Sequence, residues 1–147
     1  MKGKPSLEFF PLSTDTKQLM FMSEVPVHAG FPCPVDDAYM RQPINIIETF
    51  ISNPASSYFV RVSGDSMIDE GIDDGDFLVV DRSITPTEKH VAVCMLDGEF
   101  ALKRIVQSEG RVFLLAGNKK YKPIELNGEE DFRVYGVVVL ILRKRKV

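Results

Sequence analysis

Apolar and polar residues alternate over several short stretches of the chain, and alternation of this kind is typical of half-buried β-strands. Gly, Asp and Asn residues that favour turns separate many of these stretches. We therefore expect strands over residues 58–62, 77–81, 90–96, 99–105, 111–116 and 133–142. Asp97-Gly98 stands between the third and the fourth, and it favours a two-residue hairpin because glycine tolerates positive φ. The pattern predicts a mainly β fold, antiparallel or barrel-like.

A different period marks residues 45–52, where apolar residues recur at the spacing of one helical face: Ile46, Ile47, Phe50 and Ile51. Pro43 and Pro54 bound this stretch, so it predicts one short amphipathic helix.

The first forty residues differ from the rest because prolines interrupt them, at positions 5, 11, 26, 32 and 34. Such a segment does not sustain a long helix or a central strand. We interpret residues 1–40 as an extended N-terminal arm that lies on, or detaches from, a folded body. The body, residues 41–147, is expected to be a single β-rich domain.

Charge and hydropathy narrow the classes of partner. The net charge of −3 argues against nucleic-acid binding through the whole surface, and we expect no sequence-specific DNA binding. The basic run at residues 143–146 is able to touch phosphates, although a solubilising terminus is the more common role. The longest apolar run, residues 136–142, is far shorter than the roughly 20 residues of a membrane helix. With no signal peptide in the sequence, we expect a cytoplasmic protein without membrane contact.

The sequence also offers little to bind a metal or a cofactor. Its two cysteines form no CxxC or Cys/His spacing of the kind that holds zinc. The acidic stretch at residues 69–76 lacks the pattern of a calcium loop, which favours a solvated turn. We expect neither metal nor cofactor.

A candidate nucleophile lies in residues 63–67, Ser-Gly-Asp-Ser-Met, directly after an expected strand. Gly64 lets the backbone turn sharply, which lifts Ser66 out of the strand and exposes its hydroxyl. Backbone N–H groups of Asp65 and Ser66 at such a turn are candidates for stabilising an oxyanion. A serine alone is a poor nucleophile, because a base must take its proton.

Two kinds of base are available to this serine. The histidines are His28 and His90, and neither stands in a recognisable triad motif, so a Ser–His–Asp hydrolase is weakly supported. Lysine is the other option. Burial lowers the pKa of a lysine from about 10.4, and the neutral amine then serves as the base.

Lys103 suits that role because of its position in an expected strand. Alternation places Lys103 on one face with Ala101 and Ile105, whereas Leu102 and Arg104 share the other face. A lysine between small and apolar neighbours loses water. The pattern alone leaves ordinary interpretations open, since Gly-Asp-Ser is a common turn sequence and most strand lysines are solvated.

Several motifs in the right order resemble the self-cleaving Ser–Lys peptidases of the LexA and UmuD family. The serine segment is followed by Gly-Ile-Asp-Asp-Gly-Asp at residues 71–76 and by Val-Val-Asp at residues 79–81. Asp-Gly-Glu-Phe at residues 97–100, with Lys103 and Arg104, looks like the lysine strand of that family. Two later motifs also match, namely Asn118, Tyr121, Pro123 and Ile124, and residues 134–138. The resemblance runs from about residue 30 to the C-terminus.

This resemblance implies a β-rich fold like that of LexA and signal peptidase, with Ser66 and Lys103 as the catalytic pair. The family cuts itself at an Ala–Gly or Cys–Gly bond upstream of the serine. Ala29-Gly30, followed by Phe31-Pro32, matches that cleavage site. The resemblance also implies a homodimer, and stimulation of cleavage by a RecA filament on single-stranded DNA.

The short arm favours the UmuD branch of the family, because too little chain precedes Ala29 for a helix-turn-helix domain. That branch implies an accessory subunit of an error-prone translesion DNA polymerase in the SOS response, with a UmuC-type polymerase subunit as its partner. The alternative is a LexA-like transcriptional regulator fragment or a non-catalytic dimerisation module. A signal-peptidase relative is a third interpretation, disfavoured by the missing membrane anchor.

Overall fold

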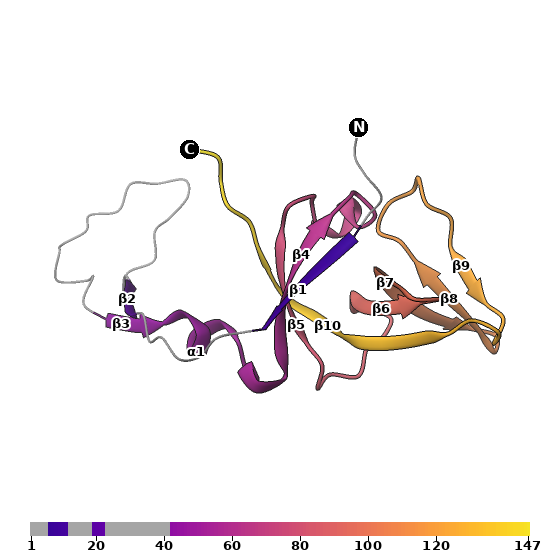
Figure 1. Cartoon of the computed structure of the whole chain (residues 1–147), viewed down its shortest axis with the longest axis horizontal. Helices are drawn as coiled ribbons and strands as arrows, with labels where there is room; N and C mark the ends of the chain where they lie inside the picture. Colours follow the sequence, from indigo (N-terminus) through magenta and orange to yellow (C-terminus); the bar gives the residue numbers. More distant parts are fainter. Residues whose placement is uncertain (1–5, 12–18, 23–41) are drawn as a thin grey trace. The chain divides into compact units, whose positions relative to one another are not determined.

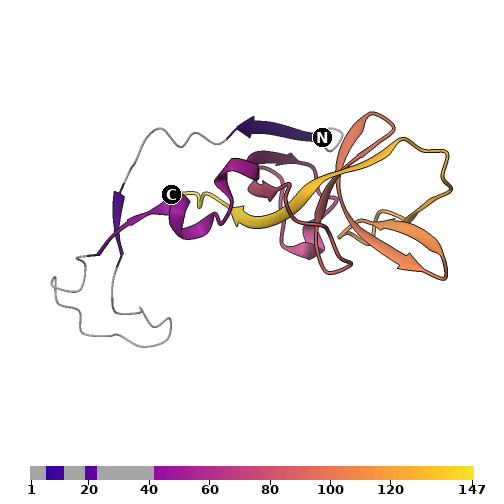
Figure 2. The same cartoon turned by 90° about the horizontal axis from the view of Figure 1, so that it is seen from below.

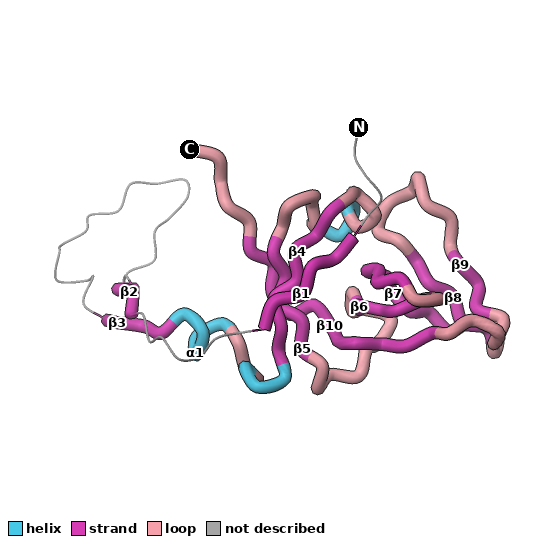
Figure 3. The backbone as a smooth tube through the Cα atoms, in the orientation of Figure 1, coloured by secondary structure: helices cyan, strands magenta, loops and turns pink. Residues whose placement is uncertain are grey.

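Strands dominate the computed structural model, which describes residues 6–11, 19–22 and 42–147 (Figures 1 and 3). The chain divides into two units, one made of Met1–Leu12 with Ala55–Val147 and the other of Ser13–Pro54. The predicted division at residue 40 stays a prediction. The two short 3₁₀ helices are η2 (Pro54–Ser56) and η3 (Ile68–Glu70).

In the smaller unit, β2 (Leu19–Met22) pairs antiparallel with β3 (Gln42–Asn45), and α1 (Ile46–Phe50) follows directly. The Asn45 side chain caps α1 by accepting a 3.2 Å hydrogen bond from the Glu48 N–H. The expected short helix is therefore confirmed, with its cap at the predicted start. Within the described part of the chain, no helix has the length and apolar character needed to cross a membrane.

The larger unit holds one antiparallel sheet in the order β1-β4-β5-β10-β6-β7-β8-β9. Its strands are β1 (Ser6–Pro11), β4 (Ser57–Ser63), β5 (Phe77–Asp81), β6 (Ala92–Leu96), β7 (Glu99–Ser108), β8 (Arg111–Leu115), β9 (Ile124–Leu126) and β10 (Phe132–Leu142). The predicted mainly β fold is confirmed. Six of these strands match the six expected ranges, whereas β1 and β9 were not expected.

The long strand β10 joins the two halves of the sheet. Its residues 132–137 pair with β6 and its residues 137–142 pair with β5, as the yellow ribbon shows from two sides (Figures 1 and 2). The β6–β7 hairpin stands next to it. Asp97 and Gly98 both have positive φ, 50° and 85°, as the expected two-residue turn requires.

The core lies on one face of this sheet and includes the segment after β4. Its buried residues are Val60, Val62, Met67, Ile72, Leu78, Val80, Val93 and Leu102. The sheet curls around them, because the Phe9 ring on β1 lies 4.7 Å from the Phe100 ring on β7, although β4, β5, β10 and β6 separate these strands in the order. Phe100 in turn meets Tyr135 of β10 edge-to-face at 5.0 Å.

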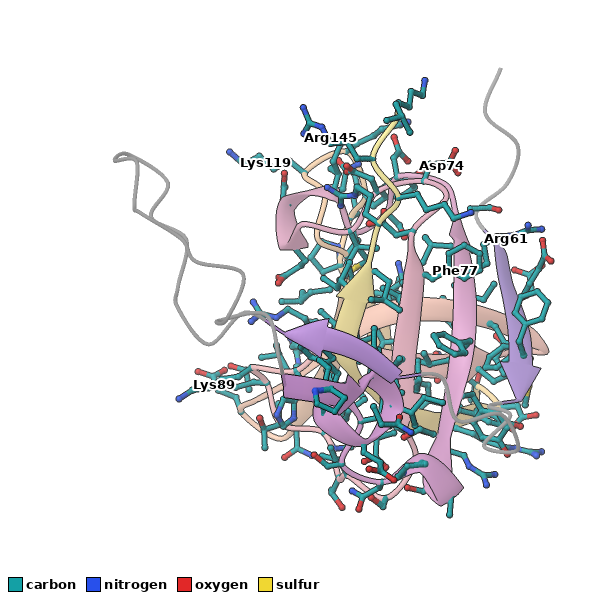
Figure 4. All side chains as sticks on the ribbon, turned by 90° about the vertical axis from the view of Figure 1, so that its left-hand side faces the viewer. Arg61, Asp74, Phe77, Lys89, Lys119 and Arg145 are labelled. Carbon is teal, nitrogen blue, oxygen red and sulfur yellow. The ribbon has the colours of Figure 1, made fainter. Side chains whose placement is uncertain are left out.

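An ion pair holds the acidic turn that precedes β5. The Asp76 side chain is 1% exposed, and the Nε and Nη2 atoms of Arg143 each lie 2.7 Å from one of its oxygens. Arg143 also donates to the Gly71 carbonyl at 2.9 Å. The turn around Asp74 and the tail around Arg145 lie at the same end of the sheet (Figure 4). One residue of the basic tail is thus committed to the fold.

The Asp76–Arg143 pair predicts a specific loss of stability. The hydrogen bonds from Arg143 hold the pKa of Asp76 below its ordinary value, against the effect of burial. We expect Arg143→Met to lower the melting temperature by roughly 5 °C or more at neutral pH, because a buried carboxylate loses its partner. The exposed Arg145→Met should leave it unchanged.

The same pair fixes the direction of the pH dependence. Because the pKa of Asp76 is depressed in the folded state, its contribution to stability is present above the unfolded pKa of about 3.9 and is lost as pH falls through the lower folded value. The gap in melting temperature between wild type and Arg143→Met should therefore close in acid. A constant gap in thermal unfolding experiments across that range contradicts this assignment.

Candidate active site

Ser66 lies on the turn between the end of β4 and η3, as the sequence predicted. Gly64 has φ of +101°, a left-handed value that favours glycine, and its N–H donates to Asp74 Oδ1 at 2.8 Å. Met67, the residue after the serine, is 1% exposed and inserts into the core. The buried Met67 side chain fixes one side of the turn while Ser66 itself stays partly exposed.

Lys103 lies on β7, and the alternation of that strand is as expected. Leu102 points into the core and is 3% exposed, while Arg104 on the same face pairs with Glu70 at 3.1 Å. Lys103 faces the other way and is half-buried. Burial lowers the pKa of its amine.

A nearby thiol does not reverse this effect near neutral pH. Cys94 would raise the pKa of Lys103 through its negative charge. However, burial raises the pKa of the Cys94 thiol to about 12, so the thiol is protonated and uncharged near neutral pH. Desolvation is therefore the main cause of the lowered pKa of Lys103, and a shift in this direction favours the neutral amine that a base requires.

One cavity brings the two candidate residues together. Ser66 and Lys103 both line a cavity of about 220 Å³, whose walls come from β1, β4, β7 and the segment around β9. The remaining lining residues are mostly apolar: Leu7, Val62, Ser63, Leu96, Glu99, Phe100, Ala101, Leu102, Tyr121 and Ile124. A mostly apolar cavity with a hydroxyl and an amine suits nucleophilic attack on a peptide carbonyl.

The segment 117–121 holds the residue that precedes the nucleophile. Tyr121 donates from its hydroxyl to Asp65 Oδ1 at 2.7 Å, and Asn118 Nδ2 donates to the Asp65 carbonyl at 2.7 Å. Lys120 Nζ lies 3.4 Å from the other carboxylate oxygen. The Tyr121 hydrogen bond is the main cause that lowers the pKa of Asp65, and it raises the pKa of Tyr121.

A second contact ties the same segment to the nucleophile turn. The Gly117 N–H donates to the Met67 sulfur at 3.1 Å, and the Gly117 carbonyl accepts from the Asp69 N–H. In Figure 3 the loop that leads to β9 passes beside η3. Asn118 and Tyr121 belong to the motifs that carry the family resemblance, which assigned neither residue a role. Their fixed spacing in the sequence marked them as a motif. The sequence did not show that they contact the turn at Asp65, which lies far away along the chain.

Several predicted features stay predictions at this point. The cleavage dipeptide Ala29-Gly30 lies outside the described residues, as does His28. The oxyanion role of the Asp65 and Ser66 amides likewise stays a prediction. Among the described residues, no three His, Cys, Asp or Glu side chains gather in a way that would hold a metal ion.

Fold and site together define a β-rich protein with a serine and a desolvated lysine on one cavity. The comparison with protein families agrees with this class, since residues 21–139 match the model described as Peptidase S24-like. The chain belongs to the Peptidase S24-like family. The resemblance to LexA and UmuD is thereby confirmed at the level of the family.

Three relatives illustrate the breadth of the similarity. Protein MucA of Salmonella typhimurium is 38% identical over 113 residues, which is 76% of this chain and 76% of the relative. Protein SamA of Salmonella typhimurium strain LT2 is 35% identical over 118 residues, 80% of this chain and 81% of the relative. The LexA repressor of Stenotrophomonas maltophilia is 34% identical over 120 residues, 82% of this chain but 56% of the relative.

The hydrogen bond between Tyr121 and Asp65 gives a direct test of the site. Tyr121→Phe removes the hydroxyl and keeps the ring, so we expect the pKa of Asp65 to rise toward its ordinary value. An NMR pH titration of the Asp65 carboxyl carbon measures this change. Tyr135→Phe, a change on β10, is the matched control and should leave the titration of Asp65 as in wild type.

Proposed function

We propose that this chain is a self-processing serine peptidase that cuts its own Ala29–Gly30 bond with Ser66 and Lys103. One observation carries the proposal: a serine on a sharp turn and a half-buried lysine with a lowered pKa line the same cavity. Membership in the Peptidase S24-like family supports it.

The proposed reaction begins with neutral Lys103, which takes the proton from the Ser66 hydroxyl. The Ser66 oxygen then attacks the carbonyl carbon of Ala29, and the amides of Asp65 and Ser66 donate to the oxyanion that forms. The C–N bond breaks as the Lys103 ammonium returns the proton to the amine of Gly30. Water, with its proton taken by Lys103, then hydrolyses the ester between Ala29 and Ser66 and completes the cut.

The pH dependence follows from the state of Lys103. Only the neutral amine accepts a proton, so the cleavage rate rises with pH until Lys103 is fully deprotonated. Because burial lowers the pKa of Lys103, the rate should level off at a lower pH than the pKa of about 10.4 of an exposed lysine would give.

Mass spectrometry after incubation at alkaline pH, or with activated RecA on single-stranded DNA, tests the proposal. Wild type should yield a fragment that begins at Gly30. Ser66→Ala should yield none, and Lys103→Ala should slow cleavage by about 10²–10⁴-fold, the usual contribution of a general base.

Two further variants sharpen the test. Lys103→Arg keeps a positive charge that does not deprotonate, so it should be inactive at every pH tested. Ser63→Ala is the matched control, because Ser63 lines the same cavity but has no proposed chemical role. Cleavage at the Ala29–Gly30 bond in Ser66→Ala would overturn the mechanism.

We further propose a UmuD-like role, as an accessory subunit of an error-prone translesion DNA polymerase in the SOS response. The UmuD-like motifs support this role, and so does similarity to MucA and SamA over three quarters or more of each protein. A RecA filament and a UmuC-type polymerase subunit are the partners this role requires. The second candidate is a LexA-like regulator or a non-catalytic dimerisation module, which the similarity to a LexA repressor favours. Co-purification with a UmuC-type subunit distinguishes the two.

A homodimer is part of the proposed role, and the end of β10 supports it. Val139, Ile141 and Leu142 are apolar yet 43%, 40% and 40% exposed. Strand residues of this kind are typical of surfaces that a second chain covers. We propose that this end of β10 contributes to the dimer contact.

Charge substitutions test that contact. Val139→Lys combined with Ile141→Lys should shift the protein from dimer to monomer in sedimentation velocity experiments, because a lysine resists burial in the interface. Val134→Lys is the matched control at the other end of β10, where Val134 is 41% exposed. A double variant that sediments like wild type would place the dimer contact elsewhere.

A further inference from the structure

The N-terminal strand β1 is an edge strand of the larger sheet. It pairs antiparallel with β4 from Ser6 opposite Ser63 to Pro11 opposite Tyr58, and β5 covers the other side of β4. In Figure 2 the indigo β1 lies along the outer side of the larger unit. A sheet edge offers unpaired N–H and C=O groups, and β1 satisfies those of β4.

The inward face of β1 contributes to two places in the body. Leu7 packs against the core and lines the cavity that holds Ser66 and Lys103. The Phe9 ring stacks at a tilt against Phe100, 4.7 Å between centroids. Leu7 and Phe9 stand at alternate positions of β1, so the surface that β1 covers favours apolar side chains at these two positions.

The outward face of β1 adds a charge contact. Glu8 forms an ion pair with Arg61 of β4, and the side chains are 47% and 45% exposed. Figure 4 shows Arg61 beside the edge strand. An exposed pair adds little affinity but favours a carboxylate at that position over a positive charge.

We propose that the β4 edge, with Arg61 and Phe100, is a binding surface for an extended peptide segment of a partner protein, and that β1 is its built-in, displaceable occupant. The fitting segment adds as a strand antiparallel to β4. It carries apolar side chains at alternate positions, as Leu7 and Phe9 do, and a carboxylate opposite Arg61. Strand addition of this kind takes its affinity from the backbone and its specificity from alternate side chains.

The inference rests in part on the proposed self-cleavage, because that cut is the event that would free β1 from the β4 edge. In the intact chain, β1 is tethered to β4 through residues 12–56, so its effective concentration is of order ~1 mM. A cut between Ala29 and Gly30 ends that covalent link. The fragment of residues 1–29 then keeps only the pairing of β1 with β4 and of β2 with β3. Without the covalent link these short pairs dissociate at micromolar protein concentration, and the β4 edge becomes available to the partner segment.

A peptide-binding experiment tests the surface without any cleavage. The parent protein is full-length Ser66→Ala, and the second protein adds Leu7→Asp and Phe9→Asp to weaken its own β1. The probe is a labelled peptide of residues 5–12, PSLEFFPL. If β1 alone binds with Kd of ~0.1 mM, its tethered copy at ~1 mM weakens probe binding to the parent about tenfold. We therefore expect about tenfold tighter binding, by fluorescence anisotropy, to the second protein.

Charge reversal supplies the matched controls. A probe with Glu8→Arg should bind the second protein about threefold more weakly, and Arg61→Glu in that protein should restore its binding. A probe with both apolar residues changed to Asp should not bind. Equal affinity for parent and second protein, or no binding of the unchanged probe, overturns the proposal.

Hydrogen exchange on wild type keeps the proposal testable if the second protein fails to fold. After self-processing, the alternate β4 amides that face β1, those of Phe59, Arg61 and Ser63, should lose protection and regain it when the probe is added. The Val62 amide, which donates to the Asp76 carbonyl on the other side of β4, and the amides of β5 should stay protected. Unchanged β4 protection in the processed protein overturns the proposal. Failure of processing itself contradicts the proposed function, while the peptide comparison in the Ser66→Ala background still decides the binding surface.

Discussion

The chemistry proposed for this site depends on one constraint, the removal of water from a lysine amine. Lys103 is half-buried because β7 sends Leu102 into the core and turns its next residue toward the cavity. The cavity lies where the curled sheet brings Leu7 of β1 and Phe100 of β7 to the same walls, although four strands separate β1 from β7 in the sheet order. Burial disfavours the charged amine, and this is the property that the proposed role of Lys103 as a base requires.

The nucleophile depends on contacts that are distant in the sequence. A short turn between strands does not by itself hold a serine in one place. Here Met67 anchors the turn in the core, Tyr121 and Asn118 bind Asp65 from the segment before β9, and Arg143 holds Asp76 from the end of β10. Both edges of the Ser66 turn are therefore fixed by side chains that lie more than fifty positions away along the chain.

The sequence pattern predicted the features that interactions between neighbouring residues determine. Alternation predicted β4, apolar runs predicted β5 and β10, and Asp97-Gly98 predicted the hairpin of β6 and β7, because neighbouring residues determine these features. The strand β1 was missed because it lies in the proline-interrupted stretch that was interpreted as an arm, and β9 was missed because it has only three residues. The shared cavity of Ser66 and Lys103 followed from alternation and resemblance, but the Tyr121–Asp65 bond did not, because nothing in the local sequence names its partner.

One strand links the proposed chemistry to the proposed surface. Leu7 forms part of the wall beside Ser66 and Lys103, and its own strand covers the edge of β4. The proposed cleavage site lies downstream of β1, so the strand that the proposed cut would release belongs both to the candidate cavity and to the edge. In the intact chain β1 contributes to the cavity wall and covers the β4 edge, and the proposed cut would remove both contributions together. The proposed cut of one peptide bond would thus change both the cavity and the β4 edge, without a separate conformational change.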